Sequence, residues 1–150
     1  SILALRGQAA VLNARIAYAS YKKIFSGPEW EALRAKGAWV QRPLWASTST
    51  KNPVYPDVLY VDTLVGRDTV NTMPFETLLA FQDHGTVKAQ TVEHDLDGAR
   101  AHFAKLEALG ISFRSITDQL LVEAIEKFNE PYDKLLASLG NKLGALRPAR

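Results

Sequence analysis

Cysteine is absent from the sequence, and its absence removes several classes of protein at once. A chain without thiols has no disulfide framework, no thiol catalysis and no zinc ribbon, and it is typical of the intracellular compartment. Long apolar runs are also absent, since none approaches the roughly 20 residues that span a bilayer. The first residues, Ser1 to Arg6, are not a basic segment followed by an apolar signal core. We therefore expect a cytoplasmic protein without a membrane partner.

An excess of one charge sign is missing as well. Lysine and arginine number 18 against 16 acids, and the basic residues are scattered among the acids instead of forming a stripe. This pattern gives no indication of a nucleic-acid partner. Hydrophobic residues make up 47% of the chain, which is enough for one compact core. Residues 1–150 are expected to form a single piece, and the start at Ser1 instead of a methionine is how a cut or processed chain reads.

Apolar periodicity and turn residues divide the chain into several helices and two short strands. A capping-box spacing from Ser26 to Glu29 predicts a short helix that ends near Gly37. The last helix should begin at Ser115 or Thr117 and be kinked by Pro131, with a fraying tail over 140–150. The expected helices are 2–25, 26–37, 56–64, 74–84, 95–109 and 115–139, and the expected strands are 39–46 and 69–73.

The order strand, loop, helix, strand, loop, helix is typical of parallel βαβ packing. Two short parallel strands are not stable alone, because a parallel sheet needs more strands and a cover on both faces. Upstream sequence could complete the sheet, other copies of the chain could do so, or the strands could instead be part of a helical bundle. The first option is the simplest. The expected fold is therefore α/β, the C-terminal portion of a (β/α)8 barrel, mostly helical with two short parallel strands.

The polar loop after the first strand is the most informative stretch for function. It contains Ser47, Thr48, Ser49, Thr50 and Lys51, and it lies past the carboxyl end of a strand, where barrels place their ligands. Hydroxyls and loop amides donate to phosphate oxygens and a lysine adds charge, so the chemistry suits a sugar phosphate. The alternative is a solvated connection. A Schiff-base role for Lys51 is disfavoured, because small polar neighbours do not activate an amine.

Other polar and aromatic residues give weaker indications. Asn71 and Thr72 end the second strand, where they could contact the same ligand or cap the helix that begins at Pro74. No metal site is expected, because the histidines are poorly spaced for shared coordination and are interpreted as structural or solvated. The tryptophans are expected in the core, since no basic stripe accompanies them. These residues are His84, His94 and His102, and Trp30, Trp39 and Trp45.

Several strings, in order along nearly the whole chain, resemble bacterial transaldolases. The resemblance implies a (β/α)8 barrel that moves a dihydroxyacetone unit from a ketose phosphate to an aldose phosphate in the pentose phosphate pathway, without metal or organic cofactor. The strings are Leu5-Arg6-Gly7 with Asn13-Ala14, Arg42-Pro-Leu-Trp-Ala-Ser-Thr-Ser-Thr-Lys-Asn-Pro53, Tyr55-Pro-Asp-Val-Leu-Tyr60, Asp68-Thr-Val-Asn-Thr-Met-Pro74 and Asp83-His84-Gly85.

The same resemblance implies roles for individual residues. The loop from Ser47 to Lys51 matches the substrate-phosphate grip, and Asn71 and Thr72 match less securely at the last strand. Several members of the family use an arginine in this grip, where the present sequence has Lys51. The family's Schiff-base lysine and its helping acids lie on earlier strands, and their motifs do not occur in this segment. No catalytic residue is therefore expected here.

The sequence supports two hypotheses of different classes. The first is the C-terminal half of a transaldolase, inactive by itself, which binds sugar-phosphate substrates once it is joined to the N-terminal half of the barrel. The second is a non-catalytic helical interaction or self-assembly module, which could form a homo-oligomer and in which the two strands are vestigial.

Overall fold

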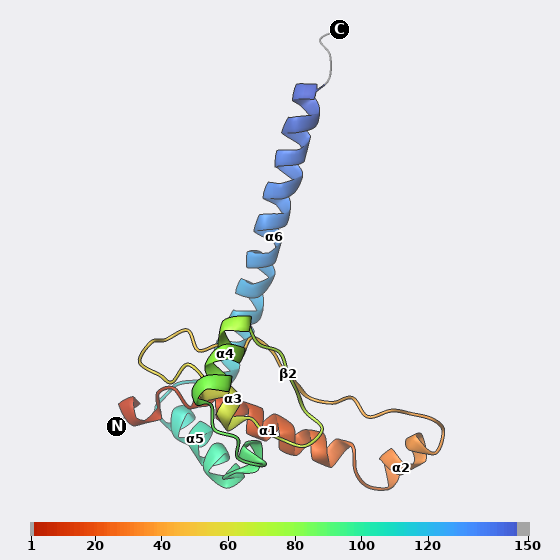
Figure 1. Ribbon diagram of the computed structural model, residues 1–150, viewed down its shortest axis with the longest axis vertical. Helices are drawn as coiled ribbons and strands as arrows, with labels where there is room; N and C mark the ends of the chain where they lie inside the picture. Colours follow the sequence, from red (N-terminus) through yellow and green to blue (C-terminus); the bar gives the residue numbers. More distant parts are fainter. Residues whose placement is uncertain (1, 147–150) are drawn as a thin grey trace. The chain divides into compact units, whose positions relative to one another are not determined.

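The computed structural model describes residues 2–146, and its helices and strands follow one another as shown in Figure 1. Two compact units divide the chain, Ser1–Lys105 and Leu106–Arg150, and each is described by itself. Within the described residues, no helix is both long enough and apolar enough to cross a membrane. The elements are η1 (Ile2–Leu5), α1 (Ala9–Ile24), α2 (Pro28–Arg34), β1 (Leu44–Trp45), α3 (Leu59–Thr63), β2 (Val70–Asn71), α4 (Phe75–His84), η2 (Thr91–Glu93), α5 (Leu96–Ala108) and α6 (Phe113–Leu146).

The N-terminal helical region is interrupted, which corrects the prediction of one helix over 2–25. A short 3-10 helix, η1, is separated from α1 by a turn at Gly7, whose φ of +76° lies in the left-handed region that favours glycine. A side chain at this position would also collide with the ring of Tyr55, because a Cβ would lie 2.8 Å from its Cζ. Gly7 thus allows the start of the chain to approach the loop that follows β1.

The second helix starts differently from the prediction. Ser26 Oγ donates to the carbonyl of Lys23 at 3.2 Å, and the N-cap of α2 is Gly27, so the predicted capping box does not form. Gly27 adopts a φ of +86°, which brings the chain into the helix with Pro28 in its first turn. Gly37 has a φ of +91° just beyond the end of α2, as predicted for a helix-terminating glycine.

The two strands are parallel, as predicted, but they are much shorter than 39–46 and 69–73. Leu44 pairs with Val70 and Trp45 with Asn71. The amide of Val70 donates to the carbonyl of Pro43 at 2.9 Å, and the amide of Thr72 donates to Trp45 at 2.9 Å. Among the described residues, β1 pairs with β2 alone, so its other edge carries no ladder that would extend it.

Helices α3 and α4 each follow one of these strands. The predicted helix over 56–64 is limited to Leu59–Thr63, whereas the one predicted over 74–84 is observed at Phe75–His84. The order β1, α3, β2, α4 confirms the predicted alternation of strand and helix. Both strands therefore point their carboxyl ends toward the same edge, where the polar loop lies.

The core of the first unit lies between α1, α3 and η2. Its buried residues are Val11, Tyr18, Leu64 and Val92, and Val92 has no exposed surface. The hydroxyl of Tyr18 donates to the carbonyl of Arg67 at 2.9 Å, so this buried polar group is satisfied. The strands are attached to this core through Trp45, whose indole Nε1 donates to the carbonyl of Leu64 at 3.1 Å.

The tryptophan prediction holds for two of the three positions. Trp30 is buried and packs edge-on against Phe25, and Trp45 is half-buried against the core. The prediction is wrong for Trp39, because 92% of its surface is exposed. It lies in an irregular stretch between α2 and β1, where no helix or strand holds it against the core.

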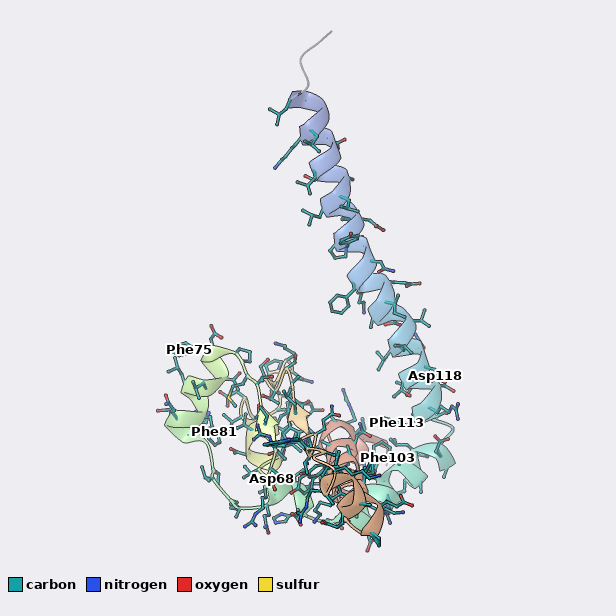
Figure 2. The ribbon with its side chains drawn as sticks, turned by 90° about the vertical axis from the view of Figure 1, so that its right-hand side faces the viewer. Asp68, Phe75, Phe81, Phe103, Phe113 and Asp118 are labelled. Atoms are coloured by element: carbon teal, nitrogen blue, oxygen red, sulfur yellow. The ribbon has the colours of Figure 1, made fainter. Side chains whose placement is uncertain are left out.

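The C-terminal helices match the prediction at their starts better than at their ends. Asp95 Oδ1 accepts the amide of Gly98 at 2.9 Å and caps α5, whose start agrees with the helix predicted over 95–109. The amide of Ser115 donates to Ser112 Oγ at 3.3 Å, so α6 begins earlier than predicted. Phe113 and Asp118, labelled in Figure 2, lie in its first turns.

Helix α6 also ends later than predicted. It is continuous through Pro131 and reaches Leu146. The prediction of a fraying tail over 140–150 is therefore wrong for residues 140–146. The remaining residues of that predicted tail, 147–150, lie outside the described part of the chain. Leu143 and Leu146 continue the apolar spacing of Leu139, which explains the longer helix. The apolar stripe predicted for this helix remains exposed along its whole length.

Candidate functional site

The polar loop after β1 lines a cavity of about 620 Å³ at the carboxyl end of the strand pair. Its first residue, Ser47, has a φ of +55°, which turns the chain sharply as it leaves β1. The rest of the lining is largely apolar. It includes Ala10 and Ala14 of α1, Trp45 of β1, and Tyr55, Tyr60 and Leu64 around α3. The cavity therefore combines an apolar wall with a few polar groups, as small-molecule sites do.

Thr48 is the buried anchor of the loop. Only 4% of its surface is exposed, and its Oγ1 lies 2.7 Å from Asn71 Oδ1 and 3.3 Å from the carbonyl of Thr72. A hydroxyl has one proton to donate, so these two acceptors compete for it and the shorter contact dominates. The structure thus brings together three residues that the sequence placed in the loop after one strand and at the end of the other. The Thr48 hydroxyl is used inside the protein and holds the loop against the end of β2.

The other polar side chains of the loop are available to a ligand. Lys51 Nζ donates to Ser49 Oγ at 2.7 Å, and Lys51 is exposed at the cavity. Thr50 Oγ1 is buried and has no hydrogen-bond partner, although buried hydroxyls nearly always have one. Since Thr50 lines the cavity, a bound ligand could supply the missing partner. Ser49, Thr50 and Lys51 together can donate hydrogen bonds to one anionic group.

Asn71 and Thr72 do not cap the helix that follows them, so that interpretation is wrong. The N-cap of α4 is Pro74, and no side chain makes a cap hydrogen bond there. The Asn71 side chain is instead half-buried and accepts the Thr48 proton. Thr72 uses its backbone, donating to Trp45 and accepting from Thr48. Their role in the described structure is to fix the position of the loop.

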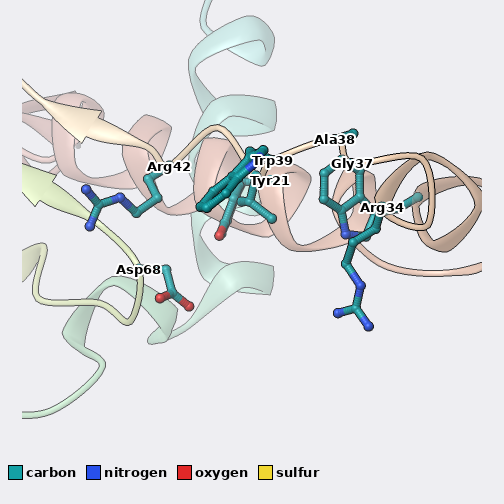
Figure 3. Close-up of a pocket in the computed structure, with 9 residues that line it drawn as sticks. Tyr21, Arg34, Gly37, Ala38, Trp39, Arg42 and Asp68 are labelled. Atoms are coloured by element: carbon teal, nitrogen blue, oxygen red, sulfur yellow. The ribbon is translucent and has the colours of Figure 1, made fainter.

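A larger cavity of about 820 Å³ lies near the amino ends of the two strands. Figure 3 shows Arg42 and Asp68 on one side of Trp39 and Arg34 on the other. No local motif marks this group, because β1 and α3 separate Arg34 from Asp68 along the chain. Ligands of parallel α/β folds bind outside the carboxyl ends of the strands, so the smaller cavity at the polar loop is the candidate site.

His84 forms a polar contact that the sequence did not reveal. Its Nε2 lies 2.9 Å from Asp57 Oδ1 and its Nδ1 lies 3.0 Å from Asp83 Oδ2. The hydrogen bond to Asp57, followed by that to Asp83, raises the pKa of His84, and the hydrogen bond to His84 lowers the pKa of Asp57. This group joins the end of α4 to the segment before α3. Within residues 2–146, no three His, Asp or Glu side chains are placed to hold a metal ion.

Comparison with known proteins gives a consistent result. The model of the transaldolase/fructose-6-phosphate aldolase family matches residues 2–139. A transaldolase of Parafrankia sp. (strain EAN1pec) is 50% identical over 142 residues, which cover 95% of this chain and 38% of the relative. A transaldolase of Thermobifida fusca (strain YX) is 47% identical over 143 residues, 95% of this chain and 39% of the relative.

A further similar protein is a transaldolase of Mycobacterium marinum (strain ATCC BAA-535 / M), which is 50% identical over 145 residues, 96% of this chain and 39% of the relative. The chain therefore spans about two fifths of the length of these relatives. The matched stretch is their C-terminal portion.

Proposed function

This chain belongs to the transaldolase/fructose-6-phosphate aldolase family, and we propose on that basis that residues 1–150 are the closing, C-terminal part of a transaldolase barrel. In this proposal, the loop Ser47–Lys51 binds the phosphate of a sugar-phosphate substrate. The observation that carries it is the Thr50 hydroxyl, buried without a partner in a cavity that also holds Lys51 at its rim.

The loop can bind phosphate without a large rearrangement. Lys51 and Ser49 are already in contact, and Thr50 lines the same cavity. One phosphate group could therefore contact the Lys51 ammonium and accept hydrogen bonds from both hydroxyls. The hydrogen bond between Thr48 and Asn71 fixes the loop, and it needs no contact with the ligand. Barrel enzymes frequently place a phosphate site in the loops after their last strands, which supports this assignment.

Transfer of a dihydroxyacetone unit needs a Schiff-base lysine, which we assign to the part of the relatives outside this segment. Lys51 is a poor candidate, because it is exposed and its hydrogen-bond partner is the hydroxyl of Ser49. A nucleophilic amine is normally activated by an apolar pocket or a neighbouring cation. The isolated 150-residue chain should therefore bind substrate weakly and turn none over.

The open edge of the strand pair supports a larger barrel. Leu44 of β1 is 53% exposed, although the strands of a closed parallel barrel are covered on both faces. An N-terminal half that supplied the preceding strands would pair with β1 and cover this residue. We propose that half as the main partner of the chain.

Reconstitution tests the proposal. The N-terminal three fifths of the Parafrankia relative would be co-expressed with this chain, and transfer from fructose 6-phosphate to an aldose phosphate would be measured. We expect activity from the mixture and none from either part. A soluble, folded complex that neither binds sugar phosphate nor transfers the unit would overturn the proposal.

A second candidate function is favoured by helix α6. Its exposed apolar side chains include Leu121, Phe128, Leu135 and Leu143, and they follow one side of the helix. Such a stripe could pair with the same stripe of a second copy, which would make the chain a self-assembling module. Sedimentation of the isolated chain distinguishes the two ideas, because a stable dimer that does not change when the N-terminal part is added would favour the second.

A further inference from the structure

A separate, smaller cavity lies between α1, α3 and the stretch around η2. It measures about 320 Å³ and shares no lining residue with the loop cavity. Basic and hydroxyl side chains dominate its wall, against a single carboxylate. The residues that matter are Arg15, Asp62, Thr63, Thr86, Lys88 and His94.

Arg15 is the central observation. Its Nε is buried and has no hydrogen-bond partner, and Arg15 takes part in none of the ion pairs found among residues 2–146. A buried donor without a partner costs about 1–3 kcal/mol, and more when the group is charged. A ligand that accepts from this nitrogen would remove that cost. The structure thus contains an unsatisfied cationic donor at the wall of a cavity.

The one carboxylate in the cavity is already engaged by the backbone. Asp62 Oδ1 accepts the amide of Thr86 at 2.9 Å, and the Asp62 carbonyl accepts from Thr91 Oγ1 at 2.8 Å. These bonds fix Asp62 as part of the framework that attaches the 86–91 stretch to α3. Arg15, Lys88 and His94 line the same cavity as this single carboxylate. The cavity therefore has an excess of positive charge.

We propose that this cavity binds a phosphate group, either as inorganic phosphate or as the phosphate of a small metabolite. The planar guanidinium of Arg15 suits bidentate contact with an oxyanion, and Lys88 adds a charge at the exposed rim. Two cations match a dianion better than a singly charged carboxylate. A volume near the lower end of the usual range of roughly 300–1,000 Å³ restricts the occupant to a small ion or the end of a metabolite.

Nuclear magnetic resonance can separate this site from the phosphate loop. The chain would be labelled with ¹⁵N, assembled with the unlabelled N-terminal part, and carry Lys51→Gln so that the loop site is weakened. Inorganic phosphate, fructose 6-phosphate and uncharged glucose would then be titrated in turn. We expect both phosphates to shift the amide of Thr86 and glucose to leave it unchanged. A response to inorganic phosphate alone would identify the free ion as the occupant.

Two exposed side chains provide a variant that should fold. In Lys88→Gln/His94→Gln, phosphate affinity at Thr86 should fall about tenfold or more, since two of the contacts are lost. Lys36→Gln, an exposed lysine outside both cavities, is the matched control and should bind normally. An unchanged Thr86 signal in the parent, or a full response in the double variant, overturns the proposal. In the same labelled chain with Lys51 restored, a response at Thr86 without amide shifts at Thr48 and Thr50 would instead count against the phosphate loop.

Discussion

The hydroxyl of Thr48 donates a 2.7 Å hydrogen bond to Asn71 Oδ1, and this contact links the loop after β1 to the end of β2. Both groups are shielded from water, since Thr48 is 4% exposed and Asn71 is half-buried. The position of Ser49, Thr50 and Lys51, which we propose as the phosphate-binding side chains, thus depends on a residue that lies on the neighbouring strand.

Replacement of Thr48 should test this link. Thr48→Val keeps the shape but leaves Asn71 Oδ1 without its donor, so we expect a loss of about 1–3 kcal/mol in the free energy of unfolding. Thr50→Val is the matched control, because the Thr50 hydroxyl is buried without a partner and its removal should leave stability unchanged or raise it. Sugar-phosphate affinity should fall in both variants. Equal stability of the two variants in urea unfolding would contradict the anchoring role.

Lys51 offers a direct test of the phosphate assignment. Lys51→Met removes the charge while keeping the length of the side chain, and sugar-phosphate binding to the reconstituted protein should weaken about tenfold or more. Lys51→Arg keeps the charge and adds a bidentate donor, so its affinity should be equal or higher. Titration calorimetry at fixed ionic strength measures both. Normal binding by Lys51→Met would remove Lys51 from the site.

The sequence predicted the order of elements well, because that order follows from local signals. Helix α4 after Pro74, the cap at Asp95 and the left-handed Gly37 each depend on residues within one or two turns. Strand length was overestimated because it depends on neighbouring strands, and β1 has one partner within the described residues. The extent of α6 was underestimated because residues 140–150 were interpreted as a fraying tail, whereas the apolar spacing continues to Leu146.

The site was predictable only in part. The loop was found because its hydroxyls and Lys51 are consecutive, and the resemblance to transaldolases points to the same residues. The different roles of its hydroxyls were not predictable. Thr48 anchors the loop through a hydrogen bond to Asn71, which lies 23 residues away in the sequence, whereas the Thr50 hydroxyl has no partner. The contact between His84 and Asp57 spans 27 residues and leaves no local pattern. Such pairings require the folded chain.

The core provides a test that is independent of any ligand. A Cβ at Gly66 would lie 2.5 Å from Val92 Cγ1, and Val92 is completely buried. Gly66→Ala should therefore destabilise the protein by about 1–3 kcal/mol through overpacking. Val92→Ala should cost about 1–3 kcal/mol through the cavity it leaves. In the double variant the two effects should partly cancel, with a coupling of about 0.5–3 kcal/mol. Simple additivity in urea unfolding would show that these two residues do not pack as described.

The pH dependence of stability follows from the contacts of His84. Hydrogen bonds to Asp57 and then Asp83 raise the pKa of His84 above its ordinary value of 6.5, while His84 lowers the pKa of Asp57 below 3.8. A histidine with a raised pKa stabilises the fold fully below its unfolded pKa and loses this contribution as pH rises through the folded pKa. The aspartate contributes above its unfolded pKa and loses its contribution as pH falls through the folded one. Both contributions are present together between about pH 4 and pH 6.5.

His84→Gln should therefore lower the melting temperature most near pH 5 and by little above about pH 8. Because these side chains are exposed, the effect should be modest and should shrink as salt is added. Asp57→Asn is the matched variant: it removes the carboxylate that is the largest cause of the raised His84 pKa, so its melting temperature should follow the same trend between pH 5 and pH 8. In the double variant, the loss should be smaller than the sum of the two single losses, since both changes break one contact. Equal losses for His84→Gln at pH 5 and pH 8 would show that a neutral packing effect, and not the charged pair, stabilises this end of α4.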